Sequence, residues 1–356
     1  MINDQVPIIK QTRISQIDAI KGFAIFLVVL GHSIQANALN FDDNSVFRII
    51  YSFHMPLFMF LSGYVTHINI NYPISGFIAK RFRTLVVPFI SWHLILFIFL
   101  GRYQQQLITH YLYTLFNCPD MGLWFLWILF LNSCIFALTV TAARRHGKIG
   151  LDSLVIASIL LVLLAGHIIH TNAFGFNLLV WHYPFFILGF LLGRKTVLNR
   201  IGFFIPFLIT SFIFYFLGYW WQRVSPPTFS DNLIHWGMLY HLHYFTSALL
   251  YIYKYAVPTF GIIASCGFFF ILAKIKNLEL NRVYSGFVWL GTYSLDIYVI
   301  HQVFVFQLGF GVGVGIIRII SSTLIAIIIS LTLSIFIIRP NKLLNICLLG
   351  SRHKAS

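Results

Sequence analysis

Ten stretches of this chain are apolar over roughly the length that an α-helix needs to cross a lipid bilayer, about 20 residues. Of the 356 residues, 59% are hydrophobic and only 9% are charged, which excludes a water-soluble domain of this length. The sequence therefore predicts an all-α protein, a polytopic membrane bundle of about ten transmembrane helices. The predicted spans are 20–39, 46–66, 85–101, 122–141, 151–170, 178–193, 202–221, 256–273, 284–306 and 312–338.

These spans divide the chain into a transmembrane domain over 20–338, an N-terminal segment over 1–19 and a basic tail over 339–356. When alternate loops are assigned to opposite sides, most Lys and Arg residues fall on one side, and this asymmetry predicts that both termini are cytoplasmic. The net charge of +15 thus reflects membrane topology, and nucleic acid is not expected as a partner. The tyrosine-rich stretch 244–255 is too short for a span, and we expect a separate re-entrant or interfacial helix there.

Two ionisable residues, Lys21 and His32, interrupt the first apolar span. Ionisable groups inside a lipid-spanning helix are costly and mark functional sites by default. Eleven residues separate the pair, which corresponds to three helical turns plus about 20° and a rise of about 16 Å. Taken alone, Lys21 is typical of an interfacial lysine and His32 of a buried, hydrogen-bonded histidine. Their shared face instead indicates a track that leads from the Lys21 end of the helix to His32.

A second histidine, His54, lies at a similar depth in the next span, which runs in the opposite direction. Pro56 follows two residues later and removes one backbone hydrogen bond, which helps to open a cavity there. A neutral imidazole can accept a proton from a hydroxyl group near pH 7. We therefore interpret His32 and His54 as candidate catalytic residues.

A basic cluster, Lys80-Arg81-Phe82-Arg83, precedes the third predicted span. Positive charge on the cytoplasmic side needs no ligand, so membrane topology alone explains the cluster. The functional alternative is a phosphate site, because arginine makes bidentate contacts with phosphate groups. The sequence leaves both interpretations open.

Polar and aromatic residues also gather near the outer ends of later spans. Trp124 begins the fourth span, and Trp181 and His182 lie near the outer end of the sixth. An aromatic belt at the membrane surface is the simple explanation for the tryptophans, and contact with a carbohydrate is the functional one. The spacing of His, Cys, Asp and Glu indicates no metal site.

The ninth predicted span contains Asp296, an acid well inside an apolar segment. A buried carboxylate needs a partner, and we expect either His32 or a cationic side chain. Tyr298 and His301 share one face of the same helix, whereas Asp296 points elsewhere.

Six ordered segments of the chain resemble the acyltransferase-3 family of membrane O-acyltransferases, and most closely its fucose-4-O-acetylase-like branch. The matching segments are "IDAIKGFAIFLVVLGHS", "YSFHMPLFMFLSGY", "KRFRTLVVPF", "LWFLWILF", "YPFFILGFLLG" and "LGTYSLDIYVIHQ", between residues 17 and 302. The resemblance implies ten core helices and transfer of an acyl group, usually acetyl, from cytoplasmic acyl-CoA to a sugar hydroxyl across the membrane. The expected acceptor is a surface polysaccharide or a lipid-linked sugar (glycolipid), and the sequence leaves both open. It also implies a location in the plasma (inner) membrane of a bacterium.

The resemblance assigns roles to individual residues. The family's Arg/Lys-x10-His motif falls on Lys21 and His32, with His32 in the catalytic position. Its R-x-x-R loop falls on Lys80 and Arg83, where the nucleotide of acetyl-CoA would bind, together with Arg81. Lysine replaces arginine at positions 21 and 80, which keeps the charge but loses a planar guanidinium.

These inferences combine into one expected mechanism. His32 acts as a base on the sugar hydroxyl or carries the acyl group itself, and Asp296 orients the imidazole. His54 assists, while the acceptor contacts the aromatic and polar side chains near the outer ends of the spans. These expected acceptor contacts are Trp124, Trp181, His182, Tyr298 and His301. The main alternative is a transporter or flippase for lipid-linked sugars, which would more typically contain internal repeats and broken helices.

Overall fold

The computed structural model is helical throughout the regular structure that it describes. The described residues are 14–66, 73–99, 113, 122–145, 150–169, 171–194, 204–223, 227, 229–239, 242–275, 277–307 and 315–351. Within them, seven helices are long and apolar enough to cross a membrane. They are α1 (Ser15–Asn37), α2 (Ser45–Thr66), α6 (Trp124–Arg145), α7 (Leu151–Ile168), α8 (Phe176–Arg194), α11 (His243–Leu272) and α14 (Ile316–Leu333), the last continued by a π-helical segment, Ser334–Ile338.

The three remaining predicted spans also coincide with helices, although each has a feature of its own. One is α9 (Phe204–Gly218), which is shorter than the others. Another begins well before its predicted start, as α3 (Ile74–Arg81), a π-helical segment (Phe82–Val86) and α4 (Val87–Phe99) in direct succession. The third is divided at Tyr293 into α12 (Leu278–Thr292) and α13 (Ser294–Gln302), followed by π-helical Val303–Gln307. The all-α membrane bundle predicted from the sequence is therefore confirmed.

Several boundaries differ from those predicted. The stretch 244–255 is not a separate helix, because α11 continues through Pro258 to Leu272. The hydroxyl of Thr259 donates to the Tyr255 carbonyl at 2.7 Å, next to the hydrogen bond that the proline removes. Helix α1 already begins at Ser15, inside the predicted N-terminal segment, and the tail contains α15 (Lys342–Leu349). A further short helix, α10 (Ser230–Leu239), precedes α11.

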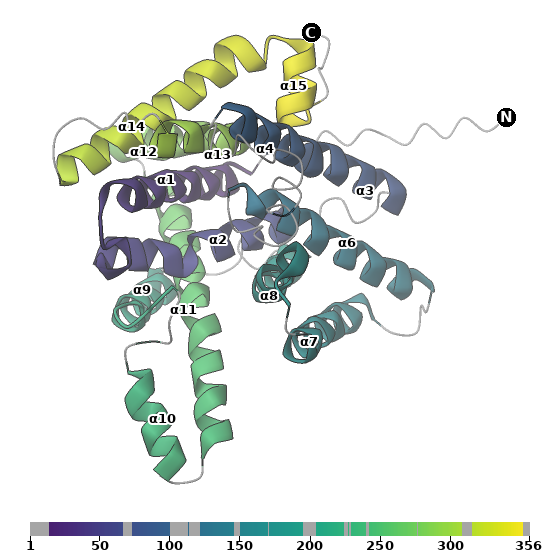
Figure 1. Cartoon of the computed structure of the whole chain (residues 1–356), viewed down its shortest axis with the longest axis vertical. Coiled ribbons are helices and arrows are strands. Elements are labelled where there is room, and N and C mark those ends of the chain that lie inside the picture. Colours follow the sequence, from purple (N-terminus) through teal and green to yellow (C-terminus); the bar gives the residue numbers. More distant parts are fainter. Residues whose placement is uncertain are drawn as a thin grey trace.

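Helices α1 and α2 lie at the centre of the bundle (Figure 1). Helix α1 contacts α2, α11, α12, α13 and α14, while α2 also contacts α6, α8, α9 and α11. In Figure 1, α12, α13 and α14 lie on one side of this central pair and α6, α7 and α8 on the other, while α10 and the first half of α11 project away. The central pair therefore connects the N-terminal and C-terminal helices, and residues on α1 and α2 can meet residues from both groups.

Two glycines bring α1 and α12 into backbone contact. A Cβ atom on Gly22 would lie 2.0 Å from the carbonyl oxygen of Phe287, and one on Gly291 would lie 1.8 Å from that of Asp18. Each glycine thus faces the backbone of the other helix where the helices cross. Small residues permit such close helix approach in membranes, where packing replaces the hydrophobic effect as the driving force.

The same arrangement joins α2 and α8. A Cβ atom on Gly63 would lie 1.8 Å from the Phe186 carbonyl oxygen, and one on Gly189 would lie 1.9 Å from that of Phe60. Each glycine again faces the backbone of the other helix, so α2 and α8 touch where they cross. The two crossings fix the register of α1 against α12 and of α2 against α8.

We predict that Gly291→Ala destabilises the protein, whereas Gly286→Ala on the same helix does not. The added methyl group at position 291 would overlap the α1 backbone, and overpacking of this kind costs about 1–3 kcal/mol. A methyl group at exposed position 286 meets no atom within 4 Å. The measurement is the unfolding midpoint of detergent-solubilised protein, and equal midpoints for the two variants would show that the crossing is not tightly packed.

Candidate active site

Two histidines from opposite ends of the sequence are paired in the bundle. His32 Nδ1 on α1 lies 2.8 Å from His301 Nε2 on α13. The two imidazole rings are nearly parallel, with an angle of 8° between their planes and 5.1 Å between their centroids. His301 is fully buried, whereas His32 is partly exposed. A reacting molecule can therefore reach His32 more easily than its partner.

The hydrogen bonds of this pair determine which nitrogen of His32 carries a proton. His301 Nδ1 donates to the carbonyl oxygen of Ile297 at 2.8 Å, so in a neutral His301 ring the Nε2 atom is the acceptor. His32 must then donate its Nδ1 proton to His301. It follows that His32 Nε2 carries a lone pair, which is the form that a general base requires.

Two further histidines contribute the same kind of nitrogen. His54 on α2 donates from Nδ1 to the carbonyl oxygen of Ile50, and His182 on α8 donates to that of Leu178, both at 2.7 Å. Both imidazoles are buried, and with Nδ1 as the donor their Nε2 atoms are acceptors in the neutral form. His54, His182 and His301 thus each bond the carbonyl four residues earlier, whereas His32 bonds another histidine.

Aromatic side chains connect these four residues, which we call the histidine cluster: His32, His54, His182 and His301. The ring of Tyr51 lies 4.8 Å from His54 and 6.5 Å from His32, measured between centroids. Trp124 at the start of α6 lies 4.9 Å from His182, and the next residue, Phe125, lies 5.5 Å from Tyr298, whose ring is 6.1 Å from that of His301. Within the described residues, no group of three or more His, Cys, Asp and Glu side chains is arranged to hold a metal ion.

The glycine crossings explain how distant residues meet in this cluster. His32 follows Gly22 by ten residues, and His301 follows Gly291 by ten. The contacts at 22 with 291 and at 32 with 301 show that α1 runs in the same direction as α12 and α13, so equal spacing places both histidines at the same level. The break at Tyr293 redirects the chain so that α13 remains in contact with α1.

The expectation that Asp296 orients His32 is wrong. Its carboxylate accepts two hydrogen bonds from Arg339, at 2.7 Å from Nε and 3.3 Å from Nη2, and another from the Ser334 hydroxyl. His301 occupies the place beside His32 instead. Positions 296 and 301 differ by about 140° around a helix, so only one of them can face α1. The alternative expectation of a cationic partner for Asp296 is the one that the structure supports.

The residues expected to bind acetyl-CoA lie toward the other end of α1. Lys21 is 26% exposed and lies 3.9 Å from Asp18. Arg81 donates to the Thr66 hydroxyl at 2.7 Å, which places it at the C-terminal end of α2. Because α2 runs antiparallel to α1, Lys21 and Arg81 lie at the same end of the bundle.

Arg83 and Lys80 differ in their surroundings. The Nε atom of Arg83 donates to the Gly350 carbonyl at 3.1 Å, so Arg83 supplies a hydrogen-bond donor to a carbonyl at the C-terminal end of α15. Lys80 is exposed and its ammonium is available to a ligand from solution. The basic cluster lies inside a continuous helical segment and not in a loop, because α3 and the π-helical segment extend through it.

Two residues that were expected to contact the acceptor, Tyr298 and Trp181, contact other parts of the protein. The buried Tyr298 hydroxyl accepts a hydrogen bond from the Phe125 backbone N–H at 3.4 Å, at the N-terminus of α6. Trp181 packs against Tyr255 of α11, with 4.6 Å between ring centroids, and its ring is edge-on to that of its neighbour His182, at 6.3 Å. Sequence reasoning also missed Tyr51, although its position one turn before His54 is a usable signal.

Comparison with known proteins shows the family. A family model described as "Acyltransferase domain" matches residues 14–339, nearly the whole chain. The chain belongs to the acyltransferase-3 family. The matched region of this acyltransferase-3 protein includes every member of the histidine cluster and the basic segment, and no solved structure matches it.

Two curated relatives carry the name nodulation protein NolL. The protein from Sinorhizobium fredii is 40% identical over 80 residues, which cover 21% of this acyltransferase-3 chain and 22% of the relative. The protein from Mesorhizobium japonicum is 28% identical over 184 residues, which cover 50% of this chain and 47% of the relative. The matches thus span less than half the length of each relative.

We predict that the His32 ring has a protonated Nδ1 and an unprotonated Nε2 at neutral pH. The measurement is solid-state NMR of ¹⁵N-histidine-labelled protein, with the His32 signals assigned as those lost in His32→Gln. His301→Phe should shift these signals because it removes the acceptor, whereas His235→Phe on exposed α10 should not. A wild-type ring protonated at Nε2 would contradict the proposed hydrogen-bond order.

Proposed function

We propose that this acyltransferase-3 protein transfers an acetyl group from acetyl-CoA to a hydroxyl group of a carbohydrate. The observation that supports this best is the His32–His301 hydrogen bond, which leaves His32 Nε2 unprotonated and partly accessible. Family membership favours acyl transfer over the alternative of a sugar transporter or flippase.

In the direct route, the acceptor hydroxyl loses its proton to His32 Nε2 while its oxygen attacks the thioester carbonyl carbon. The resulting imidazolium keeps its Nδ1 hydrogen bond to neutral His301, which stabilises the positive charge. Collapse of the tetrahedral intermediate breaks the C–S bond, and His32 returns the proton to the CoA thiolate. The products are free CoA and an O-acetylated sugar.

The same geometry supports a two-step route. Here His32 Nε2 attacks the thioester, releases CoA and carries the acetyl group until the acceptor arrives. In this case another base must take the proton of the hydroxyl group. The Nε2 atoms of His54 and His182 in the same cluster are candidates for that role.

The donor would approach from the Lys21 end of the bundle. The phosphates of acetyl-CoA would bind near Lys80, Arg81 and Arg83, and the pantetheine arm would pass Lys21. The rise of about 16 Å between Lys21 and His32 matches the scale of that arm. We place this end on the cytoplasmic side of a bacterial inner membrane, and the histidine cluster nearer the outer surface, where the carbohydrate is modified.

We predict that His32→Gln lowers turnover by at least about 10²–10⁴-fold, the typical contribution of a general base. His301→Phe should lower kcat by about 10²-fold with little change in the KM for acetyl-CoA, because it misplaces the base without touching the donor. The assay is acetyl transfer from labelled acetyl-CoA, and His235→Gln is the matched control. Wild-type turnover in well-expressed His32→Gln would rule out the mechanism.

We predict that Lys80→Gln raises the KM for acetyl-CoA more than it lowers kcat, because a phosphate contact is equal in the ground and transition states. Dephospho-CoA thioesters should be affected less. Arg83→Gln should also lower the unfolding midpoint, since Arg83 binds the Gly350 carbonyl. Substitution of the exposed Lys342 on α15 by glutamine is the control. An unchanged KM in Lys80→Gln would show that the basic cluster serves membrane topology and does not bind the donor.

A further inference from the structure

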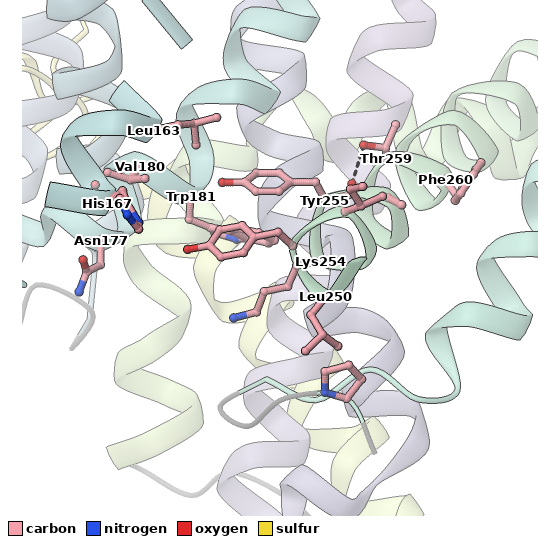
Figure 2. Close-up of a pocket in the computed structure, with 15 residues that line it drawn as sticks. Leu163, His167, Asn177, Val180, Trp181, Leu250, Lys254, Tyr255, Thr259 and Phe260 are labelled. Atoms are coloured by element: carbon pink, nitrogen blue, oxygen red, sulfur yellow. Dashed lines mark hydrogen bonds between the residues drawn. The ribbon is translucent and has the colours of Figure 1, made fainter. Parts of the chain in front are cut away.

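A groove of about 1160 Å³ opens between α7, α8 and the first half of α11, outside the histidine cluster (Figure 2). Its walls are mainly apolar and aromatic, and they include Leu163, Val180, Trp181 and Tyr255. A pocket of this size in a membrane protein can hold a lipid chain or a small amphipathic molecule. Neither the histidine pair nor the basic segment contributes to it.

Polar groups gather on one side of the groove. His167, Asn177 and Lys254 are all exposed, and among the residues that the structure describes, none that lines the groove is acidic. Figure 2 shows the Lys254 side chain extending from α11 toward the side where His167 and Asn177 lie. A cation without an acidic neighbour in the lining favours a negatively charged ligand group, and a primary ammonium is a suitable contact for phosphate.

The groove continues into a smaller and almost entirely apolar slot of about 320 Å³. Leu163, Tyr255 and Thr259 line both cavities, so the two are contiguous. The slot itself is lined by Phe185 and Leu188 together with other apolar side chains of α7 and α8. A ligand that fills both spaces therefore has a polar, negatively charged end and a long apolar end.

The polar part of the groove is separated from the histidine cluster only by α8. Trp181 faces Tyr255 in the groove, whereas His182, the next residue, faces Trp124 in the cluster. A head group held near Lys254 would thus lie beside the helix that carries His182. The groove and the histidine cluster are therefore one helix apart.

We infer that the groove binds the lipid phosphate of a membrane-anchored acceptor, with the phosphate at Lys254 and the apolar chain in the slot. This inference rests on the proposed function and adds the substrate class, a sugar linked to a long-chain lipid through phosphate. A free sugar phosphate would not use the apolar slot, and an uncharged lipid would not use Lys254.

The test is binding of a C55 polyprenyl phosphate to the purified protein in nanodiscs of zwitterionic phosphatidylcholine, measured by native mass spectrometry. Lys254→Gln should weaken binding at least about tenfold, as loss of a charge-assisted contact requires. Arg318→Gln removes an exposed cation from α14, outside the groove, and should have no effect. Ala256→Trp should fill the groove and weaken both polyprenyl phosphate and the uncharged polyprenol.

Three outcomes would overturn the inference. The first is that phosphatidylglycerol binds as tightly as polyprenyl phosphate, which indicates an ordinary membrane lipid site. The second is that inorganic phosphate competes as well as polyprenyl phosphate does. The third is that Lys254→Gln binds polyprenyl phosphate with unchanged affinity. Cleavage of labelled acetyl-CoA is measured on the same preparations. If wild type and Lys254→Gln both cleave the thioester but do not bind the lipid phosphate, only this inference fails; if wild type never cleaves it, the proposed function fails.

Discussion

The contact between Gly22 on α1 and Gly291 on α12 is the constraint on which the candidate site depends. It brings two parallel helices close enough that each backbone touches the other, and so it leaves little freedom for sliding or rotation. His32 and His301 each lie ten residues beyond this contact, where a shift of one residue would separate their nitrogens. The geometry of the proposed catalytic pair is thus set by backbone packing about ten residues away from it.

A second set of contacts holds α13 in place after the helix is interrupted at Tyr293. The Asp296 carboxylate lies in the first turn of α13 and binds Arg339 and Ser334, while the Arg339 guanidinium lies 4.4 Å from the centre of the Tyr293 ring. The Asp296 carboxylate is buried although the Arg339 side chain is 41% exposed, so removing Arg339 would leave a buried charge without its partner. In the proposed mechanism, Asp296 therefore acts by positioning the helix of His301.

The spans could be predicted because a bilayer demands long apolar helices, and the similar depth of His32 and His54 follows from helix rise and a short loop. The partner of Asp296 could not be predicted, because it depends on the rotation of α13 against α14. The sequence offers membrane topology or phosphate binding as explanations of the basic cluster, and neither includes the contact of Arg83 with Gly350 after α15. Such a contact depends on how the C-terminal helix folds back. The continuity of α11 could not be predicted, because whether a proline such as Pro258 ends a membrane helix or is accommodated within it depends on the packing of neighbouring helices.

The use of a histidine rather than a carboxylate beside His32 has a physical reason. A carboxylate would stabilise an imidazolium more strongly, but an ionised acid beside the base would need its own partners inside the membrane. His301 supplies an acceptor nitrogen while remaining neutral, and the Ile297 carbonyl holds its ring in place. The one buried acid of this helix, Asp296, is instead placed where Arg339 can neutralise it. In the proposed mechanism, this arrangement separates charge compensation from catalysis. His32 can gain and lose a proton while the ion pair between Asp296 and Arg339 stays intact.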